Sequence, residues 1–323
     1  MLLAFLSQSI LHAFVAALFV EALLRVWRIE DGVWRLRFRL LALAVPVLWL
    51  PVLFLFAPFR NGAVFIAGWA LFAGERWNQV RIAGSGLGDL VLLLAAGLGS
   101  ALFLRDALPP ALDLLRGTSP MPDAGPWHTA GPGVRAVVRR HADALGITVP
   151  DIRVVRASTP VLLCEGARRP VLVVSPATLE RLQGAELDVA VAHELAHAEH
   201  HDPAWGYVLI AIRAVLFFNP AVQWMARALV DDIERRADQV AVRATGNAGA
   251  LIRVISILFD SGHPPPVDDD ASFERVFWRI RKSGVERRCA RLRRTEPMVP
   301  TGHGPALMAM AALAVLGLVF FVV

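Results

Sequence analysis

The stretch 185–202, AELDVAVAHELAHAEHHD, combines a helical pattern with four histidines and several carboxylates. Residues four apart lie one turn apart on one face of an α-helix, so His193 and His197 are expected to stack, with apolar side chains on the opposite face. Two imidazoles one turn apart can bind one Zn²⁺, and Glu194 between them can act on a water at the metal. The alternative is an amphipathic helix with a histidine-rich, solvated face. The HExxH spacing would arise by chance in a chain of this size only about once in a hundred, which favours the metal site.

The other two histidines fit this site less well. His200 follows His193 by seven residues, a rise of roughly 10 Å along a helix, so the two cannot ligate the same ion. We therefore expect His200 and His201 on the surface. Asp202 is expected to form a hydrogen bond within the fold or to cap the next element.

The third metal ligand is expected in the segment ALVDDIERRADQVAV, 228–242. Glu234 and Asp238 stand four apart and share a helical face. Glu234 can complete a His₂Glu ligand set, and Asp238 can orient a ligand imidazole by a hydrogen bond. The alternative is a charged helix face with ordinary ion pairs, but the position downstream of HExxH favours the ligand interpretation.

The chain is unusually apolar: 56% of its 323 residues are hydrophobic. Four segments approach the ~20 residues that cross a bilayer: 3–24, 40–57, 86–104 and 305–323. The first lacks a preceding basic stretch and a convincing cleavage site, so we interpret it as a transmembrane helix rather than a signal peptide.

Arginines predict the orientation of these spans. Five of them fall in the expected loop between the first two segments: Arg25, Arg28, Arg35, Arg37 and Arg39. The positive-inside rule makes this loop cytoplasmic, which puts both termini outside a bacterial-type inner membrane and the histidine cluster inside. The segment ERRCARLRR, 286–294, agrees with that side. Cys164 and Cys289 then lie in a reducing compartment, where no disulfide is expected.

The expected fold is a multi-pass α-helical membrane protein with a cytoplasmic α+β domain. We expect three transmembrane helices in 1–106 with an extracytoplasmic loop at 58–85, a linker at 107–133, the α+β domain at 134–304 and a last transmembrane helix at 305–323. Three strands are expected within 151–158, 160–166 and 169–176. A mobile loop is expected at 263–272.

The apolar stretch 205–224 could cross the membrane, but a single crossing would separate the histidines from Glu234. We therefore expect two short apolar helices that turn back at FFNP, 217–220, where Asn219–Pro220 breaks the helix. Arg213 also argues against free burial in lipid.

At these motifs the chain resembles the membrane metallopeptidases of the antirepressor type, the BlaR/MecR-like family of the β-lactam sensor-transducers. The resemblance rests on GARRPVLVVSPATLERLQGAELDVAVAHELAHAEHHD, LFFNPAVQW and ERRADQVAV. It covers roughly residues 150–245. The chain is also similar to the HtpX-like and CAAX-prenyl-type endopeptidases, which share HExxH followed by an ExxxD helix.

The resemblance implies a minigluzincin-type zinc peptidase domain with one Zn²⁺, held by His193, His197 and Glu234, and with Glu194 as general base. It also implies that 171–175 is an edge strand that aligns a peptide by β-augmentation. The substrate-binding candidates are Leu172, Val173, Val174, Ser175 and Asn219. Candidate oxyanion donors are Asn219, Tyr207 and His263. The chain stops at Val323 with no sensor domain after its last span, so direct β-lactam sensing is not expected.

We expect an endopeptidase that cleaves a protein substrate on the cytoplasmic side, in regulatory proteolysis of a repressor or another partner. Two alternatives stay open: an HtpX-like quality-control protease, and a non-catalytic transducer in which zinc only stabilises the domain. The expected partners are a protein or peptide substrate and the lipid bilayer. Direct nucleic-acid binding is not expected, because no aromatic-interleaved basic platform is present. Whether the chain forms a homo-oligomer stays open.

Overall fold

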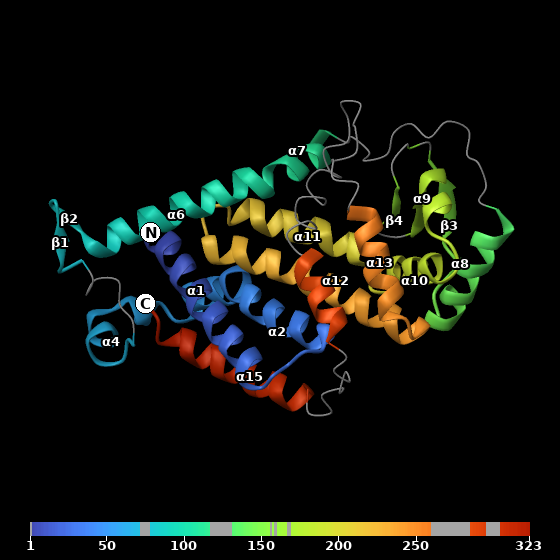
Figure 1. Cartoon of the computed structure of the whole chain (residues 1–323). Coiled ribbons are helices and arrows are strands. Elements are labelled where there is room, and N and C mark those ends of the chain that lie inside the picture. Colours follow the sequence, from blue (N-terminus) through green and yellow to red (C-terminus); the bar gives the residue numbers. More distant parts are fainter. Residues whose placement is uncertain are drawn as a thin grey trace. The chain divides into compact units, whose positions relative to one another are not determined.

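The computed structural model describes residues 2–71, 78–116, 131–155, 157, 160–166, 169–259, 285–294 and 304–323. Most of the expected linker, the expected loop at 263–272 and His263 lie outside these residues. Figure 1 labels the helices and strands along the chain. The chain divides into two compact units. The first comprises Met1–Leu108, Ile212–Asp232 and Met298–Val323, and the second comprises Pro109–Ala211 and Ile233–Pro297.

The first unit is mainly helical. Its elements are α1 (Leu2–Val26), α2 (Gly32–Ala44), the π-helical turn η1 (Val45–Trp49), α3 (Leu50–Phe56), the 3₁₀ turn η2 (Pro58–Asn61), α4 (Ala63–Gly68), the short strands β1 (Arg81–Ile82) and β2 (Ser85–Gly86), α6 (Leu87–Asp106) and α15 (Gly304–Phe320). In the part of the chain described, three helices are long and apolar enough to cross a membrane: Phe5–Val26, Gly32–Phe56 and Leu87–Asp106. The fourth expected span forms α15, an apolar helix of 17 residues.

The second of these helices begins earlier than the sequence predicted. Asp31 caps it, with its Oδ1 accepting a hydrogen bond from the Trp34 N–H at 3.0 Å. Arg35, Arg37 and Arg39 therefore lie on α2, and the prediction that they form a loop is wrong. The N-cap carboxylate stabilises the helix at that point and shortens the connection.

Inside this unit the α2 arginines meet buried carboxylates. Arg39 donates to Glu21 at 2.6 Å and to Asp232 at 2.6 Å, and Arg35 donates to Asp232 at 3.1 Å. The two carboxylates and the Arg39 side chain are almost wholly buried. Two guanidiniums and two carboxylates thus form a closed ion network, which satisfies the rule that buried charges are paired.

Two further helices, α11 (Asp202–Val215) and α12 (Pro220–Thr245), each contribute residues to both units. The expected turn lies between them, where Asn219 is fully buried. Its Oδ1 caps α12 by accepting from the N–H groups of Ala221 and Val222, and its Nδ2 donates to the Ser9 carbonyl at 2.9 Å. The helix after the turn is not short, as expected, but 26 residues long. A single helix therefore carries both Asp232 and Glu234.

The second unit contains a small mixed sheet and several helices: α7 (Leu108–Arg116), α8 (Pro132–Leu145), β3 (Asp151–Val154), β4 (Leu162–Glu165), β5 (Val171–Val174), α9 (Pro176–Arg181), α10 (Ala185–Glu199) and α13 (Ala248–Phe259), with a further helix at 285–293. The strand order is β3-β5-β4. β5 pairs in parallel with β3 and antiparallel with β4. The expected edge strand at 171–175 is therefore the central strand, which corrects the sequence prediction.

The central position of β5 follows from its side chains. All four residues are buried. Leu172 and Val174 face the main core with α8, α10 and α13, whereas Val171 and Val173 pack on the other face of the sheet. A continuous apolar run of this kind is typical of a strand that is covered on both faces and paired on both edges.

Candidate metal centre

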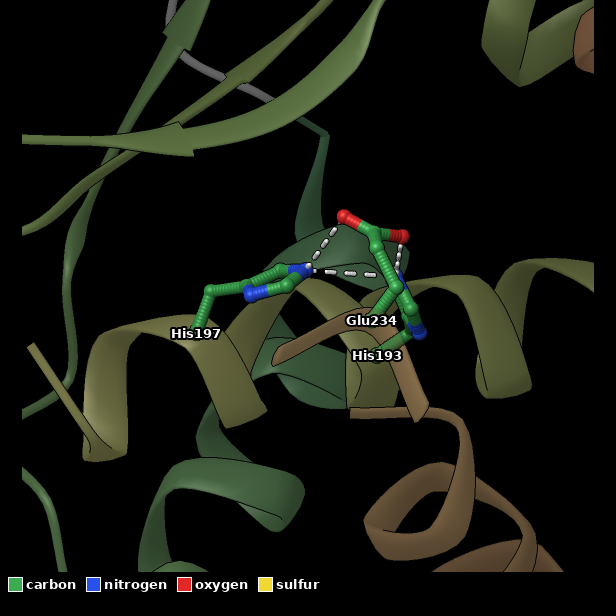
Figure 2. A group of neighbouring side chains, drawn as sticks. All are labelled: His193, His197 and Glu234. Atoms are coloured by element: carbon green, nitrogen blue, oxygen red, sulfur yellow. Dashed lines mark hydrogen bonds and ion pairs between the residues drawn. The ribbon is translucent and has the colours of Figure 1, made fainter. Parts of the chain in front are cut away.

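Three buried side chains converge between α10 and α12 (Figure 2). The Nε2 atoms of His193 and His197 are 3.3 Å apart. Glu234 Oε2 lies 3.6 Å from His193 Nε2, and Glu234 Oε1 lies 3.8 Å from His197 Nε2. One donor atom from each residue falls within 4.8 Å of the others, a spacing that suits ligands of one metal ion.

The convergence depends on how deeply α10 is buried. Every residue from Val189 to Ala198 is buried, including His193, Glu194 and His197. The helix packs against α8, α13 and β4 in the second unit. A histidine-rich solvated face is therefore absent over this part of α10, and the amphipathic alternative is wrong there. Polar groups buried this completely need partners.

The far nitrogens of both imidazoles face carboxylates. His197 Nδ1 is 2.9 Å from Asp202 Oδ2, and His193 Nδ1 is 3.3 Å from Asp238 Oδ1. A carboxylate at Nδ1 keeps the proton on that nitrogen and leaves Nε2 as an electron-pair donor. The sequence predicted this contact for Asp238. For Asp202 it predicted only a hydrogen bond or a cap, and the structure identifies His197 as the partner.

Arg288 is the residue of this cluster that the sequence interpretation missed. It donates to both carboxylate oxygens of Asp238, at 2.6 and 3.0 Å, and to Glu234 Oε2 at 2.6 Å. Arg236 donates through Nη2 to one oxygen of Asp202, Oδ1. Arg288 lies in ERRCARLRR, which the sequence suggested only as a topology determinant. Arg288 and the adjacent Cys289 are buried in the structure, but nothing in the run of arginines separates Arg288 from its neighbours in the sequence.

Glu194 lies at the outer edge of the sheet. Its Oε2 accepts a hydrogen bond from the Cys164 N–H of β4 at 3.1 Å. The Val161 carbonyl accepts a hydrogen bond from the Ser175 N–H, so Val161 points its backbone groups toward the strand that contains β5. In an antiparallel pair, successive residues point their N–H and C=O groups alternately toward and away from the neighbouring strand. The N–H and C=O groups of Leu162 and Cys164 therefore point away from β5. Among the strands that the structure describes, β4 is therefore an edge strand, and its outer edge faces the glutamate between the two histidines.

The electrostatics of the cluster follow from its burial and its carboxylates. Burial alone would lower the pKa of His193, but Asp238 and Glu234 outweigh it and raise that pKa to about 9. Burial would raise the pKa of Asp238, and the nearby Arg288 and His193 instead hold it below its ordinary value. Burial together with the charges of Glu194 and Glu165 raises the pKa of the Cys164 thiol to about 12, so this thiol is not a nucleophile near neutral pH.

The residues present fit a divalent cation. Glu194, Asp202, Glu234 and Asp238 bring four carboxylates to the two imidazoles, and within this cluster Arg236 and Arg288 supply two guanidiniums. The nearby carboxylates raise the pKa of His193, because their negative charge favours the protonated, positively charged imidazole. The same negative charge favours a metal cation in place of the proton. A His₂Glu donor set with buried partners at Nδ1 is typical of zinc sites that keep one position open.

The remaining sequence candidates lie elsewhere. His200 is half-buried and His201 is exposed, with a positive φ of 54°. Leu172, Val173 and Val174 are buried in the central strand, and Ser175 caps α9 by accepting from the Thr178 N–H. The Asn219 side chain donates a hydrogen bond to the Ser9 carbonyl and accepts one from the Ala221 N–H at the start of α12. Tyr207 is partly exposed on α11. The three residues whose donor atoms converge are His193, His197 and Glu234, and the remaining sequence candidates are not among them.

Residues 151–248 match the family model described as BlaR1 peptidase M56. No curated protein matches the chain. The matched segment contains the whole sheet, α10 and the part of α12 that carries Glu234 and Asp238. Over this segment the chain is similar to a family of membrane-associated metallopeptidases and sensor-transducers, and its apolar helices and its candidate metal site agree with that likeness.

Proposed function

We propose that this protein is a membrane-bound zinc endopeptidase in which His193, His197 and Glu234 hold the metal and Glu194 is the general base. The observation that carries this assignment is the three facing donor atoms within 4.8 Å, beside a glutamate held at the free edge of a strand. A purely structural zinc site is usually closed by four protein ligands and has no use for Glu194.

When bound, zinc supplies Lewis acidity, which polarises the scissile carbonyl and makes a water more acidic. Glu194 accepts the proton of the attacking water and later delivers it to the departing amine. Asp202 and Asp238 keep the two imidazoles in the tautomer that offers Nε2. Arg288 donates to Glu234 Oε2 and so fixes the orientation of this carboxylate, which would hold the metal.

We assign substrate alignment to β4 in place of β5. An extended peptide can pair with the outward N–H and C=O groups of Leu162 and Cys164, which lie on the edge that faces Glu194. The Cys164 N–H then exchanges its bond with the Glu194 carboxylate for a bond with the peptide. This exchange releases the base at the moment when a substrate arrives.

We further propose that the second unit works on the cytoplasmic side of an inner membrane, with the spans in 1–106 and 305–323 as anchors and 134–304 as the peptidase domain. Arg25 and Arg28 at the end of α1 support this orientation by the positive-inside rule. The substrate proposed is a protein partner such as a repressor. Broad quality-control proteolysis is the alternative, and proteomics of proteins that accumulate in cells carrying Glu194→Gln distinguishes one substrate from many.

The direct test uses purified full-length chain in detergent, with cleavage of denatured casein and self-cleavage as readouts and metal content measured in parallel. Glu194→Gln is expected to lower cleavage by a factor of about 10² to 10⁴ while the zinc content stays at the wild-type level. Glu186→Gln is the matched control, because Glu186 is on the same helix and pairs with the exposed Arg253. Wild-type proteolysis in the Glu194→Gln chain would falsify the assignment.

A further inference from the structure

One face of α6 packs against the turn between α11 and α12 inside the first unit. A Cβ on Gly99 would lie 2.3 Å from the Phe218 carbonyl oxygen, so the two backbones touch there. One turn further on, the rings of Phe103 and Phe217 are 6.0 Å apart. Asp106 follows on the same face and ends the helix. The packing therefore fixes the carboxylate of Asp106 against α11 and α12.

Three arginines gather around this carboxylate. Arg105 donates to Asp106 Oδ1 at 2.9 Å, Arg227 pairs with Asp106 Oδ2, and Arg213 Nη2 lies 4.0 Å from the same oxygen. They come from three helices: α6, α11 and α12. One carboxylate carries one negative charge, so it cannot balance three guanidiniums, and guanidiniums this close repel one another.

Arg213 is the clearest sign of a missing partner. Only 5% of the residue is exposed, and among the residues that the structure describes its Nη2 has no hydrogen-bond partner. Its position is nevertheless fixed, because its Nε donates to Gln223 Oε1 at 2.8 Å while Gln223 Nε2 donates back to the Arg213 carbonyl at 3.1 Å. A buried, oriented and unsatisfied guanidinium N–H costs free energy unless an acceptor binds it.

The surroundings indicate where such an acceptor comes from. α6 is one of the three helices able to cross a membrane, and the arginines gather at its last turn, where a span of 20 residues reaches the bilayer surface. Leu98 and Leu104 on α6 and Trp224 on α12 remain exposed at 55%, 57% and 41%. Apolar side chains next to a cationic cluster suit a ligand with acyl chains and an anionic headgroup.

We propose that Arg105, Arg213 and Arg227 form a binding site for the phosphate of an anionic phospholipid at the end of α6. Guanidinium groups bind phosphate oxygens by paired, charge-assisted hydrogen bonds, which Arg213 Nη2 is placed to complete. Asp106 holds the arginines together while the site is empty. The headgroup then fixes α6 to the α11–α12 hairpin through one shared anion.

The experiment measures lipid retention by native mass spectrometry of the full-length chain in detergent. Phosphatidylglycerol, phosphatidylcholine and inorganic phosphate are titrated separately. We expect phosphatidylglycerol to bind about tenfold more tightly than phosphatidylcholine, and Arg227→Gln and Arg213→Gln each to remove that preference. The Arg105 side chain is 65% exposed, so Arg105→Gln should leave folding intact. This variant therefore tests the site even if Arg213→Gln, at a buried position, impairs folding.

Arg81→Gln is the matched control, since it removes an exposed arginine at the other end of the α6 segment. It is expected to keep the tenfold preference. Equal binding of both lipids by the wild-type chain, or an unchanged preference in Arg105→Gln and Arg227→Gln, overturns the proposed site. Saturable binding of inorganic phosphate that displaces phosphatidylglycerol overturns the assignment to lipid and leaves a site for free phosphate.

Discussion

Around the paired histidines, carboxylates outnumber guanidiniums, whereas at the end of α6, guanidiniums outnumber carboxylates. In the part of the chain that the structure describes, Glu194, Asp202, Glu234 and Asp238 lie with Arg236 and Arg288 in the first cluster. Asp106 meets Arg105, Arg213 and Arg227 in the second. The first cluster is buried, and in the second Arg213 and Asp106 are largely buried while Arg105 is exposed; charge imbalance is costly at the buried groups. The sign of the excess therefore indicates the sign of what binds: a cation in one region and an anion in the other.

A third cluster supplies the reference case. Among the described residues, Glu21 and Asp232 face Arg35 and Arg39, so two negative charges meet two positive charges. This network holds α1, α2 and α12 together within the first unit. Its balance predicts a purely structural role, in contrast to the other two clusters.

The largest expected effect comes from removing a ligand of the negative cluster. Loss of a residue that only hydrogen-bonds a metal ligand weakens metal binding by up to roughly 100-fold. Glu234→Gln removes a ligand itself, so it is expected to weaken zinc binding by more than that and to abolish cleavage. Removing the metal from the wild-type chain with a chelator should abolish cleavage and also lower the melting temperature, because bound metal stabilises the folded state. Metal content and thermal unfolding are measured together. A zinc-loaded, active Glu234→Gln chain contradicts the ligand assignment.

In the balanced cluster the expected effect is on stability and not on metal binding. Asp232→Asn leaves Arg39 without its second carboxylate and is expected to lower the free energy of unfolding by about 3–5 kcal/mol. Urea unfolding of the detergent-solubilised protein measures the loss. The control is Asp231→Asn, at the half-buried residue next to Asp232, for which a smaller loss in the free energy of unfolding is expected. Loss of zinc from correctly folded Asp232→Asn protein would show that this network is not merely structural.

A smaller effect is expected from the partner of His197. Asp202→Asn removes the negative charge at Nδ1 but keeps the shape, and it should weaken zinc binding by roughly 10- to 100-fold. Competition with a fluorescent zinc chelator gives the affinity. Asp188→Asn on the same unit, which pairs with His141 away from the three ligands, is the control. Equal affinities for the two variants would remove the orienting role of Asp202.

The smallest effect is expected at Cys164. Its raised pKa of about 12 means that the thiolate is scarce at pH 8, by roughly a thousandfold relative to a thiol with the ordinary value. The thiolate appears only as the pH approaches the raised pKa, so alkylation at pH 8 should be much slower in the folded than in the urea-unfolded chain. Cys164→Ala should change cleavage by less than about twofold, because only its backbone N–H contacts Glu194. A large loss of activity would give the thiol a chemical role.

The sequence predicted those parts of the molecule that follow from local periodicity. The three strands, the HExxH helix and the break at Asn219–Pro220 were expected and are present, because each depends on neighbours within a few residues. The convergence of Glu234 on His193 and His197 is a long-range contact, and it was expected from the position of Glu234 and Asp238 downstream of HExxH and from the family resemblance. The structure brings Asp238 to His193 as expected, while the metal itself stays a proposal.

The errors arose where long-range contacts decide. The order of the strands depends on pairing between segments, so 171–175 was placed at an edge although it is central. Arg35 and Arg39 were assigned to a loop because charges interrupt an apolar run, whereas Glu21 and Asp232 neutralise Arg39 on the helix. Arg288 was missed for the same reason, since its partners lie 50 and 54 residues away in the chain.

The distance of Arg288 along the chain has a consequence for biosynthesis. Both histidines, Glu234 and Asp238 leave the ribosome before Arg288, which lies near the end of the 323-residue chain. Until the segment 285–293 emerges, the carboxylates of Glu234 and Asp238 lack the guanidinium that binds them both. The order of synthesis therefore delays completion of the cluster until residue 288 has been made, and a nascent chain that stops earlier carries the HExxH motif without the finished cluster.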